Sequence, residues 1–132
     1  MRTARMLKSL FALLMVIFLV QGCAAPEGDK TTASDFAITM KMEPASPKVG
    51  QNVMTLTVKD KEGEPVVGAE ITVDPQMPAH GHGSSEKAKV EDLGDGNYKA
   101  SPVTLQMKGD WEITVTVKAG DKSGTKVFKL TL

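Results

Sequence analysis

Residues 111–117, Trp-Glu-Ile-Thr-Val-Thr-Val, alternate large apolar side chains with polar ones over seven positions. Successive side chains of a β-strand point to opposite faces of a sheet, so this period of two predicts a strand with one buried face. Trp111 falls in the buried phase and is expected to lie in the core. The same alternation recurs at residues 36–42, where Phe36 begins a second half-buried strand that ends before Pro44.

Further strands are predicted at 53–58, 66–73, 88–90, 98–107 and 128–132. Turn-forming residues separate them, above all at 60–63 and 94–97. Gly68 is expected to mark a bulge or bend, and Pro102 an edge or bulge position. Tyr98 is expected to bury its ring and to give its hydroxyl a backbone partner. About seven short strands without helical periodicity predict an all-β fold, an immunoglobulin-like antiparallel β-sandwich.

Residues 1–22 have the pattern of a signal peptide, because three basic residues precede the apolar run 10–20. The run ends at Gln21-Gly22-Cys23, which resembles the lipobox of bacterial lipoproteins. That resemblance implies that Cys23 is acylated, with fatty acids such as palmitate, and anchors the mature protein in a membrane. Ala24, in place of aspartate, then implies the outer membrane facing the periplasm, or the outer face of the plasma membrane in a Gram-positive source. Ordinary secretory cleavage with a free thiol is the alternative.

The predicted mature chain divides into a tether and one domain. Residues 23–35 are rich in small and charged residues, which is typical of a flexible tether, and residues 36–132 have the length of one sandwich domain. Removing residues 1–22 leaves 13 basic against 16 acidic residues, a net charge of −3. No basic patch with interleaved aromatic residues occurs, so nucleic-acid binding is disfavoured.

Both histidines of the chain lie in residues 77–84, Met-Pro-Ala-His-Gly-His-Gly-Ser. Imidazole nitrogen and thioether sulfur suit copper, and the thioether favours Cu(I) over zinc. In an extended segment His80 and His82 would project the same way and could face one ion with Met77. The same composition is also typical of an ordinary exposed loop, so a loop without metal remains the alternative.

Strand direction predicts which residues can join this loop. Consecutive strands of such a sandwich alternate in direction, so the connections after the first, third and fifth strands lie at one end. Met107, Trp111 and Met42 therefore share an end with the histidine loop, and Met107 becomes a fourth candidate ligand beside Met77, His80 and His82. Met107 and Met42 also fall in the inward phase of their strands, which favours core positions for both.

No catalytic constellation is apparent. The two histidines are the bases of suitable pKa, and both lie on one glycine-rich loop with no orienting partner in the pattern. Glu86, Glu91 and Asp92 are spaced as solvated charges of a strand and its turn. The sequence therefore predicts that the protein is not an enzyme.

Several motifs together resemble one family. They are Gly63…Pro65-Val66…Ala69…Val73, the Met77-Pro78…His80-Gly81 loop, Asp95-Gly96-Asn97-Tyr98 and Met107-Lys108-Gly109-Asp110-Trp111. This order resembles the YtkA-like domain, a bacterial envelope module related in pattern to the FixH proteins that accompany cytochrome oxidase assembly. A looser similarity extends to copper-carrying sandwiches of the CopC type, although this chain lacks their amino-terminal histidine.

Two functional hypotheses of different class follow. In the first, a membrane-anchored lipoprotein binds or transfers copper, as Cu(I), through the histidine loop. In the second, the same end of the domain binds no metal and docks on a membrane-protein partner, in a respiratory or efflux complex. Stoichiometric copper in the purified protein would distinguish the first from the second.

Overall fold

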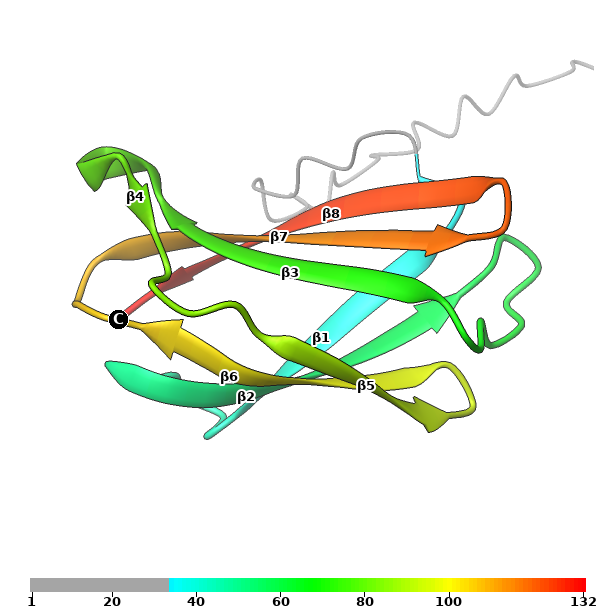
Figure 1. The fold of residues 1–132 in the computed structure, drawn as a ribbon, viewed down its shortest axis with the longest axis horizontal. Helices are drawn as coiled ribbons and strands as arrows, with labels where there is room; N and C mark the ends of the chain where they lie inside the picture. Colours follow the sequence, from blue (N-terminus) through cyan, green and yellow to red (C-terminus); the bar gives the residue numbers. More distant parts are fainter. Residues whose placement is uncertain (1–33) are drawn as a thin grey trace, which may run out of the picture.

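The computed structural model describes residues 34–132, which form two facing antiparallel sheets (Figure 1). One sheet has the order β1 (Ala37–Glu43), β2 (Gly50–Lys59), β6 (Asn97–Leu105) and β5 (Lys89–Gly94). The other has the order β4 (His82–Gly83), β3 (Glu70–Met77), β7 (Asp110–Ala119) and β8 (Lys122–Thr131), with a 3₁₀ turn, η1 (Pro78–His80), before β4. The predicted all-β sandwich is confirmed, with eight strands in this part of the chain because the histidine loop forms a short strand of its own.

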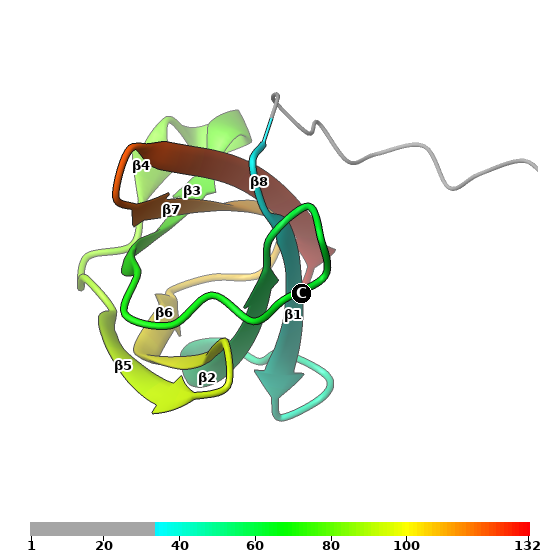
Figure 2. The ribbon, with the colours of Figure 1, turned by 90° about the vertical axis from the view of Figure 1, so that its right-hand side faces the viewer.

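The core lies between the two layers, which are seen end-on in Figure 2. The inner faces of β2 and β7 supply fully buried side chains from alternate positions, as the period of two predicts: Met54, Leu56, Val58, Trp111, Ile113, Val115 and Val117. No helix among residues 34–132 is long and apolar enough to cross a membrane.

The third strand lies further along the chain than the prediction of 66–73. β3 begins at Glu70 and continues to Met77, and Val67 is 62% exposed. Gly68 adopts a left-handed backbone with φ 68°, which ends any strand before it. The Tyr98 hydroxyl donates to the Val66 carbonyl at 2.7 Å and accepts the Ala69 N–H at 3.1 Å, so these peptide groups are bound by a side chain in place of a neighbouring strand.

The Tyr98 hydroxyl therefore has the backbone partners predicted for it, and its side chain is 1% exposed. Burial raises the pKa of the Tyr98 hydroxyl, which keeps the group protonated and able to donate. Asp92, predicted as a solvated charge, fixes the same loop, since its carboxylate accepts the N–H groups of Gly68 at 2.7 Å and Gly94 at 2.8 Å. These bonds lower the pKa of Asp92.

Pro102 lies at an irregularity, as predicted. The register between β2 and β6 shifts between Asn52 and Met54, opposite the segment that contains Pro102. The Asn52 side chain, 2% exposed, donates to the carbonyls of Lys48 and Gly50 at 2.8 and 3.1 Å. A side chain thus satisfies backbone groups that the ladder leaves unpaired at this end of β2.

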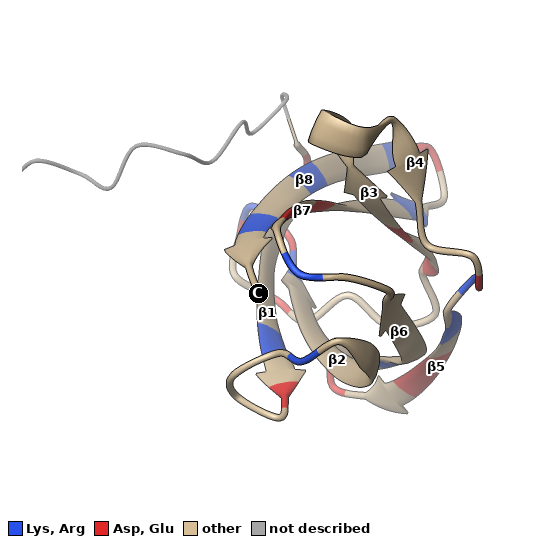
Figure 3. Ribbon diagram, turned by 90° about the vertical axis from the view of Figure 1, so that its left-hand side faces the viewer, with Lys and Arg blue, Asp and Glu red and all other residues tan. Residues whose placement is uncertain are grey.

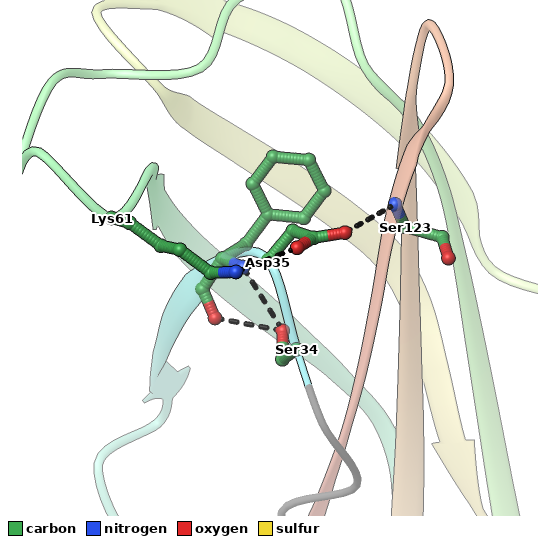
Figure 4. Close-up of polar contacts among 5 residues, drawn as sticks. Ser34, Asp35, Lys61 and Ser123 are labelled. Carbon is green, nitrogen blue, oxygen red and sulfur yellow. Dashed lines mark hydrogen bonds and ion pairs between the residues drawn. The ribbon is translucent and has the colours of Figure 1, made fainter.

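The described chain begins at a polar clamp (Figure 4). The Asp35 carboxylate binds the Lys61 ammonium at 2.9 Å and accepts the Ser123 N–H at 3.3 Å, while the Asp35 N–H donates to the Ser123 carbonyl at 3.2 Å. The hydrogen bond from Lys61 lowers the pKa of Asp35 and raises that of Lys61. The clamp fixes the start of β1 beside the β7–β8 turn. The predicted signal peptide, Cys23 and the predicted tether up to residue 33 lie outside the described residues.

Candidate functional site

The histidine loop is a closed turn and not an extended segment. Pro78 opens η1, and Gly81 follows with a left-handed φ of 67° and donates its N–H to the Met77 carbonyl at 3.1 Å. The chain reverses there, so that His82 pairs with Met77 across β3 and β4. Ser84 donates to the Pro75 carbonyl at 2.9 Å and closes the hairpin. The backbone of the loop is therefore fixed on β3.

The turn brings the two imidazole rings together by a different route from the one predicted. Their centroids lie 5.9 Å apart with the planes tilted by 44°, and both side chains are exposed. The ring of His82 also meets the ring of Trp111 edge-on, with centroids 6.3 Å apart. The alternation argument was wrong about the backbone, but the histidines do lie side by side on the surface of the same loop.

Met107 is exposed, and the core position that the inward phase favoured for it was wrong. β6 ends at Leu105, so the alternation that places side chains inward stops two residues before Met107. The side chain is 38% exposed, and the Met107 carbonyl accepts the Trp111 indole N–H at 3.0 Å. The thioether is thus accessible, and Trp111, fully buried as predicted, fixes the backbone that carries it.

Met77 and Met42 lie in the core. Met77 is 1% exposed at the end of β3, and its methyl group lies against Gly109, where an added Cβ would come within 2.5 Å of it. Met42 is 6% exposed, as expected for a core residue. Of the four candidate ligands, the structure presents His80, His82 and Met107 to solvent and buries Met77 at the end of β3.

The predicted meeting of the two loops at one end of the sandwich is confirmed. Figure 3 looks at this end and shows η1 and β4 beside the β6–β7 loop. The contacts of His82 with Trp111 and of Met77 with Gly109 join the loops, and the Gln106 amide lies 3.5 Å from the Gly83 carbonyl. We call this end, with the exposed side chains of His80, His82 and Met107, the histidine pole.

Glu86 fixes the chain that leaves the loop, a role that sequence reasoning missed. Its carboxylate accepts hydrogen bonds from Thr104 at 3.1 Å and from Gln51 at 3.4 Å, which ties the segment after β4 to the opposite sheet. Ser84 supports it by donating to the Glu86 carbonyl at 2.9 Å. The sequence carried no signal for this contact, because the three side chains come from distant parts of the chain.

The donor set of the histidine pole is neutral. Residues 77–85 contain no Lys, Arg, Asp or Glu, so η1 and β4 are tan in Figure 3. Among residues 34–132, no group of three or more His, Cys, Asp or Glu side chains could hold a metal ion. A metal at this pole would therefore be held by imidazole and thioether, which suit Cu(I) and do not suit magnesium or calcium.

A groove of about 470 Å³ lies beside η1. Pro78 and Ala79 line one side, Leu130 contributes apolar surface, and the Glu112–Lys129 ion pair, 3.2 Å long, also lines the groove. Trp111 lies behind this lining, since its side chain is fully buried. The lining of the groove is therefore part apolar and part charged.

The domain is a small immunoglobulin-like β-sandwich of two sheets with a tryptophan in its core. A fixed and exposed histidine loop lies at one end. The model of the YtkA-like family matches residues 30–116, and the chain belongs to this family. The match covers β1 to most of β7 and includes the whole histidine loop. No curated protein and no solved structure matches the chain.

Proposed function

We propose that this protein binds or transfers Cu(I) through His80, His82 and Met107, and that it is a binding protein and not an enzyme. The observation that supports this most directly is the pair of exposed imidazole rings 5.9 Å apart on a fixed loop. Met107 lies on the neighbouring loop with its thioether accessible. Two borderline ligands and one soft ligand are the donors that Cu(I) favours.

The buried Met77 supports the loop from beneath in the described arrangement. Its thioether can join the three exposed ligands only if the end of β3 opens, because the side chain is 1% exposed. Three ligands leave Cu(I) accessible to a further ligand from outside. This suits transfer between proteins, in which a donor or acceptor ligand must reach the ion.

The experiment is an anaerobic Cu(I) titration of the full chain against a competing chelator, with zinc as a second metal. We expect one Cu(I) per chain and weaker binding of zinc. Replacing His80 and His82 with alanine should abolish Cu(I) binding and leave the melting temperature of the apo protein nearly unchanged, because exposed loop side chains contribute little to the core.

Met107→Leu should weaken Cu(I) binding at unchanged stability, because leucine keeps the apolar volume and removes the sulfur. Met40→Leu on β1 is the matched control, since Met40 is a partly buried methionine that packs against the core and is not one of the proposed ligands. Affinity should also fall on acidification, because protonated imidazole cannot coordinate. If the wild-type chain took up no Cu(I), the metal proposal would be abandoned.

The second candidate function is a docking module without metal, and the groove beside η1 favours it. Pro78 and Ala79, which line the groove, precede His80 in the same turn, so a partner in the groove could also contact the histidine pole. The partner proposed in either case is a membrane protein of copper handling, efflux or respiratory complex assembly. A protein that binds no copper and still binds such a partner would support this second function.

We further propose that the protein is a lipoprotein of the cell envelope, anchored through Cys23. The lipobox-like segment before Cys23 and the YtkA-like family assignment support this placement. Ala24 favours the outer membrane facing the periplasm in a Gram-negative source, and the outer face of the plasma membrane applies in a Gram-positive one. The anchor is tested by a serine substitution described below.

A further inference from the structure

The methionines of the described residues differ sharply in their exposure. Met42, Met54 and Met77 are buried, and Met40 is partly buried against the core. Met107 is exposed, at 38% of its surface. A dissolved reagent that attacks thioether sulfur therefore reaches Met107 more readily than any other methionine of residues 34–132.

Backbone hydrogen bonds hold the loop that carries Met107. Its carbonyl accepts the Trp111 indole N–H at 3.0 Å, and Gly109 exchanges two backbone hydrogen bonds with Leu132, of 3.0 and 3.3 Å. None of these bonds involves the Met107 side chain, so a change at its sulfur leaves them in place. The buried Met77 differs, because a polar oxygen added to its sulfur would lose its hydration in the core.

We propose that Met107 is a site of reversible oxidation by hydroperoxides, and that its sulfoxide weakens Cu(I) binding at the empty histidine pole. The thioether sulfur attacks one oxygen of the hydroperoxide, a sulfur–oxygen bond forms and the O–O bond breaks. The proton of the transferred oxygen moves to the leaving oxygen, which departs as water or an alcohol. The sulfur is oxidised by two electrons and the hydroperoxide is reduced by two. Methionine sulfoxide reductases reverse the change.

This regulation rests on the proposed Cu(I) function, because it acts on the same donor set. The thioether is the soft ligand of that set and favours Cu(I). Its oxidation makes the Met107 side chain polar and removes this ligand. The imidazoles of His80 and His82, with centroids 5.9 Å apart, remain. Oxidation therefore converts a site of three ligands into a site of two histidines.

Peptide mapping after treatment with hydrogen peroxide tests the modification site. The protein is the apo full chain carrying Cys23→Ser, since this change removes the only cysteine, which would also react. Trypsin cleaves after lysine, and a lysine separates each of these methionines from the next. The peptides are 31–41 for Met40, 42–48 for Met42, 49–59 for Met54, 62–87 for Met77 and 100–108 for Met107.

We expect peptide 100–108 to gain the mass of one oxygen atom first and peptide 31–41 to follow more slowly. The peptides with buried methionines should react last. The same treatment in urea is the control for intrinsic reactivity, because unfolding exposes all of these sulfurs. In urea the peptides should react at similar rates.

Anaerobic Cu(I) titration after removal of the peroxide tests the regulation. The oxidised protein should bind Cu(I) more weakly than the reduced protein, by the same factor as Met107→Leu, and a methionine sulfoxide reductase should restore binding. Oxidation of Met107→Leu should cause no further loss, whereas oxidation of Met40→Leu should weaken binding as in the wild-type domain. The melting temperature of the oxidised apo protein should be nearly unchanged, because an exposed side chain contributes little to the core.

Three results would overturn the proposal. Oxidation of Met40 or of a buried methionine as fast as Met107 in the folded protein would refute the modification site. Unchanged Cu(I) affinity after complete oxidation of Met107, or an equal loss of affinity in Met107→Leu, would refute the regulation. A reduced protein that takes up no Cu(I) would instead refute the proposed function, and the regulation with it, while the peptide map still decides the modification site.

Discussion

Replacing Trp111 with alanine should destabilise the domain by about 3–5 kcal/mol, the usual cost of deleting a large buried aromatic side chain. The side chain is 0% exposed and lies at the junction of the two loops of the histidine pole. A buried aromatic ring removes about 150–250 Å² from water, which at about 25 cal/mol per Å² corresponds to about 4–6 kcal/mol. Alanine retains part of this contribution. The lost indole bond to the Met107 carbonyl, 3.0 Å long, adds about 1 kcal/mol at most, because water can reach an exposed turn.

The assay is urea unfolding followed by far-ultraviolet circular dichroism, since Trp111 is the only tryptophan and its removal eliminates the tryptophan fluorescence signal. A small domain has about 5–15 kcal/mol of total stability, so the variant should unfold at a much lower urea concentration or fail to fold at physiological temperature. Trp111→Phe is the matched control and should lower the free energy of unfolding by less, because phenylalanine keeps most of the apolar surface. An unchanged midpoint for the alanine variant would refute the placement of Trp111 in the core.

Three further predictions address the anchor, the tyrosine and the pH dependence. Cys23→Ser should move the protein from the membrane fraction to the soluble fraction, and retention after high-salt washing would contradict the anchor. Tyr98→Phe should cost about 2 kcal/mol in urea unfolding, from the two backbone hydrogen bonds of its hydroxyl, and a loss below about 0.5 kcal/mol would show that water replaces them. The pKa of Asp92 is lowered from 3.8 by hydrogen bonds from Gly94 and Gly68. The stability that the ionised Asp92 carboxylate contributes is therefore present above about pH 4 and is lost as the pH falls through its lowered pKa. Asp92→Asn should accordingly make the melting temperature fall less steeply below about pH 4.

Alternation along the chain predicted the strands that carry the core, because burial of one sheet face imposes a period of two on the residues themselves. β1, β2 and β7 lie where their apolar residues indicated. β3 did not, because Val66 and Val67 have the composition of a strand while the left-handed Gly68 and the Tyr98 hydroxyl hold them outside the ladder. Gly68 signalled a bend locally, but the hydrogen bonds of Tyr98 come from some thirty positions away and have no local signal.

The candidate site was predictable in its location more than in its geometry. Strand direction alone placed Met107 at the end of the sandwich that holds the histidines. The exposure of Met107 was not predictable from the alternation of inward and outward side chains, because β6 ends at Leu105 and the chain then turns. Likewise, two histidines separated by one glycine suggested an extended segment, whereas Pro78 and Gly81 form a tight turn that brings the rings to 5.9 Å.

The clamp at Asp35 has a consequence for how a lipid-anchored form would present its ligands. β1 starts at the clamp beside the β7–β8 turn, and the histidine loop lies at the other end of the sandwich (Figure 1). The ten residues of β7 span about 30 Å between these ends. A chain anchored at Cys23 would therefore enter the domain at the end opposite its histidines, so the anchor and the candidate ligands would be separated by the full length of the sandwich.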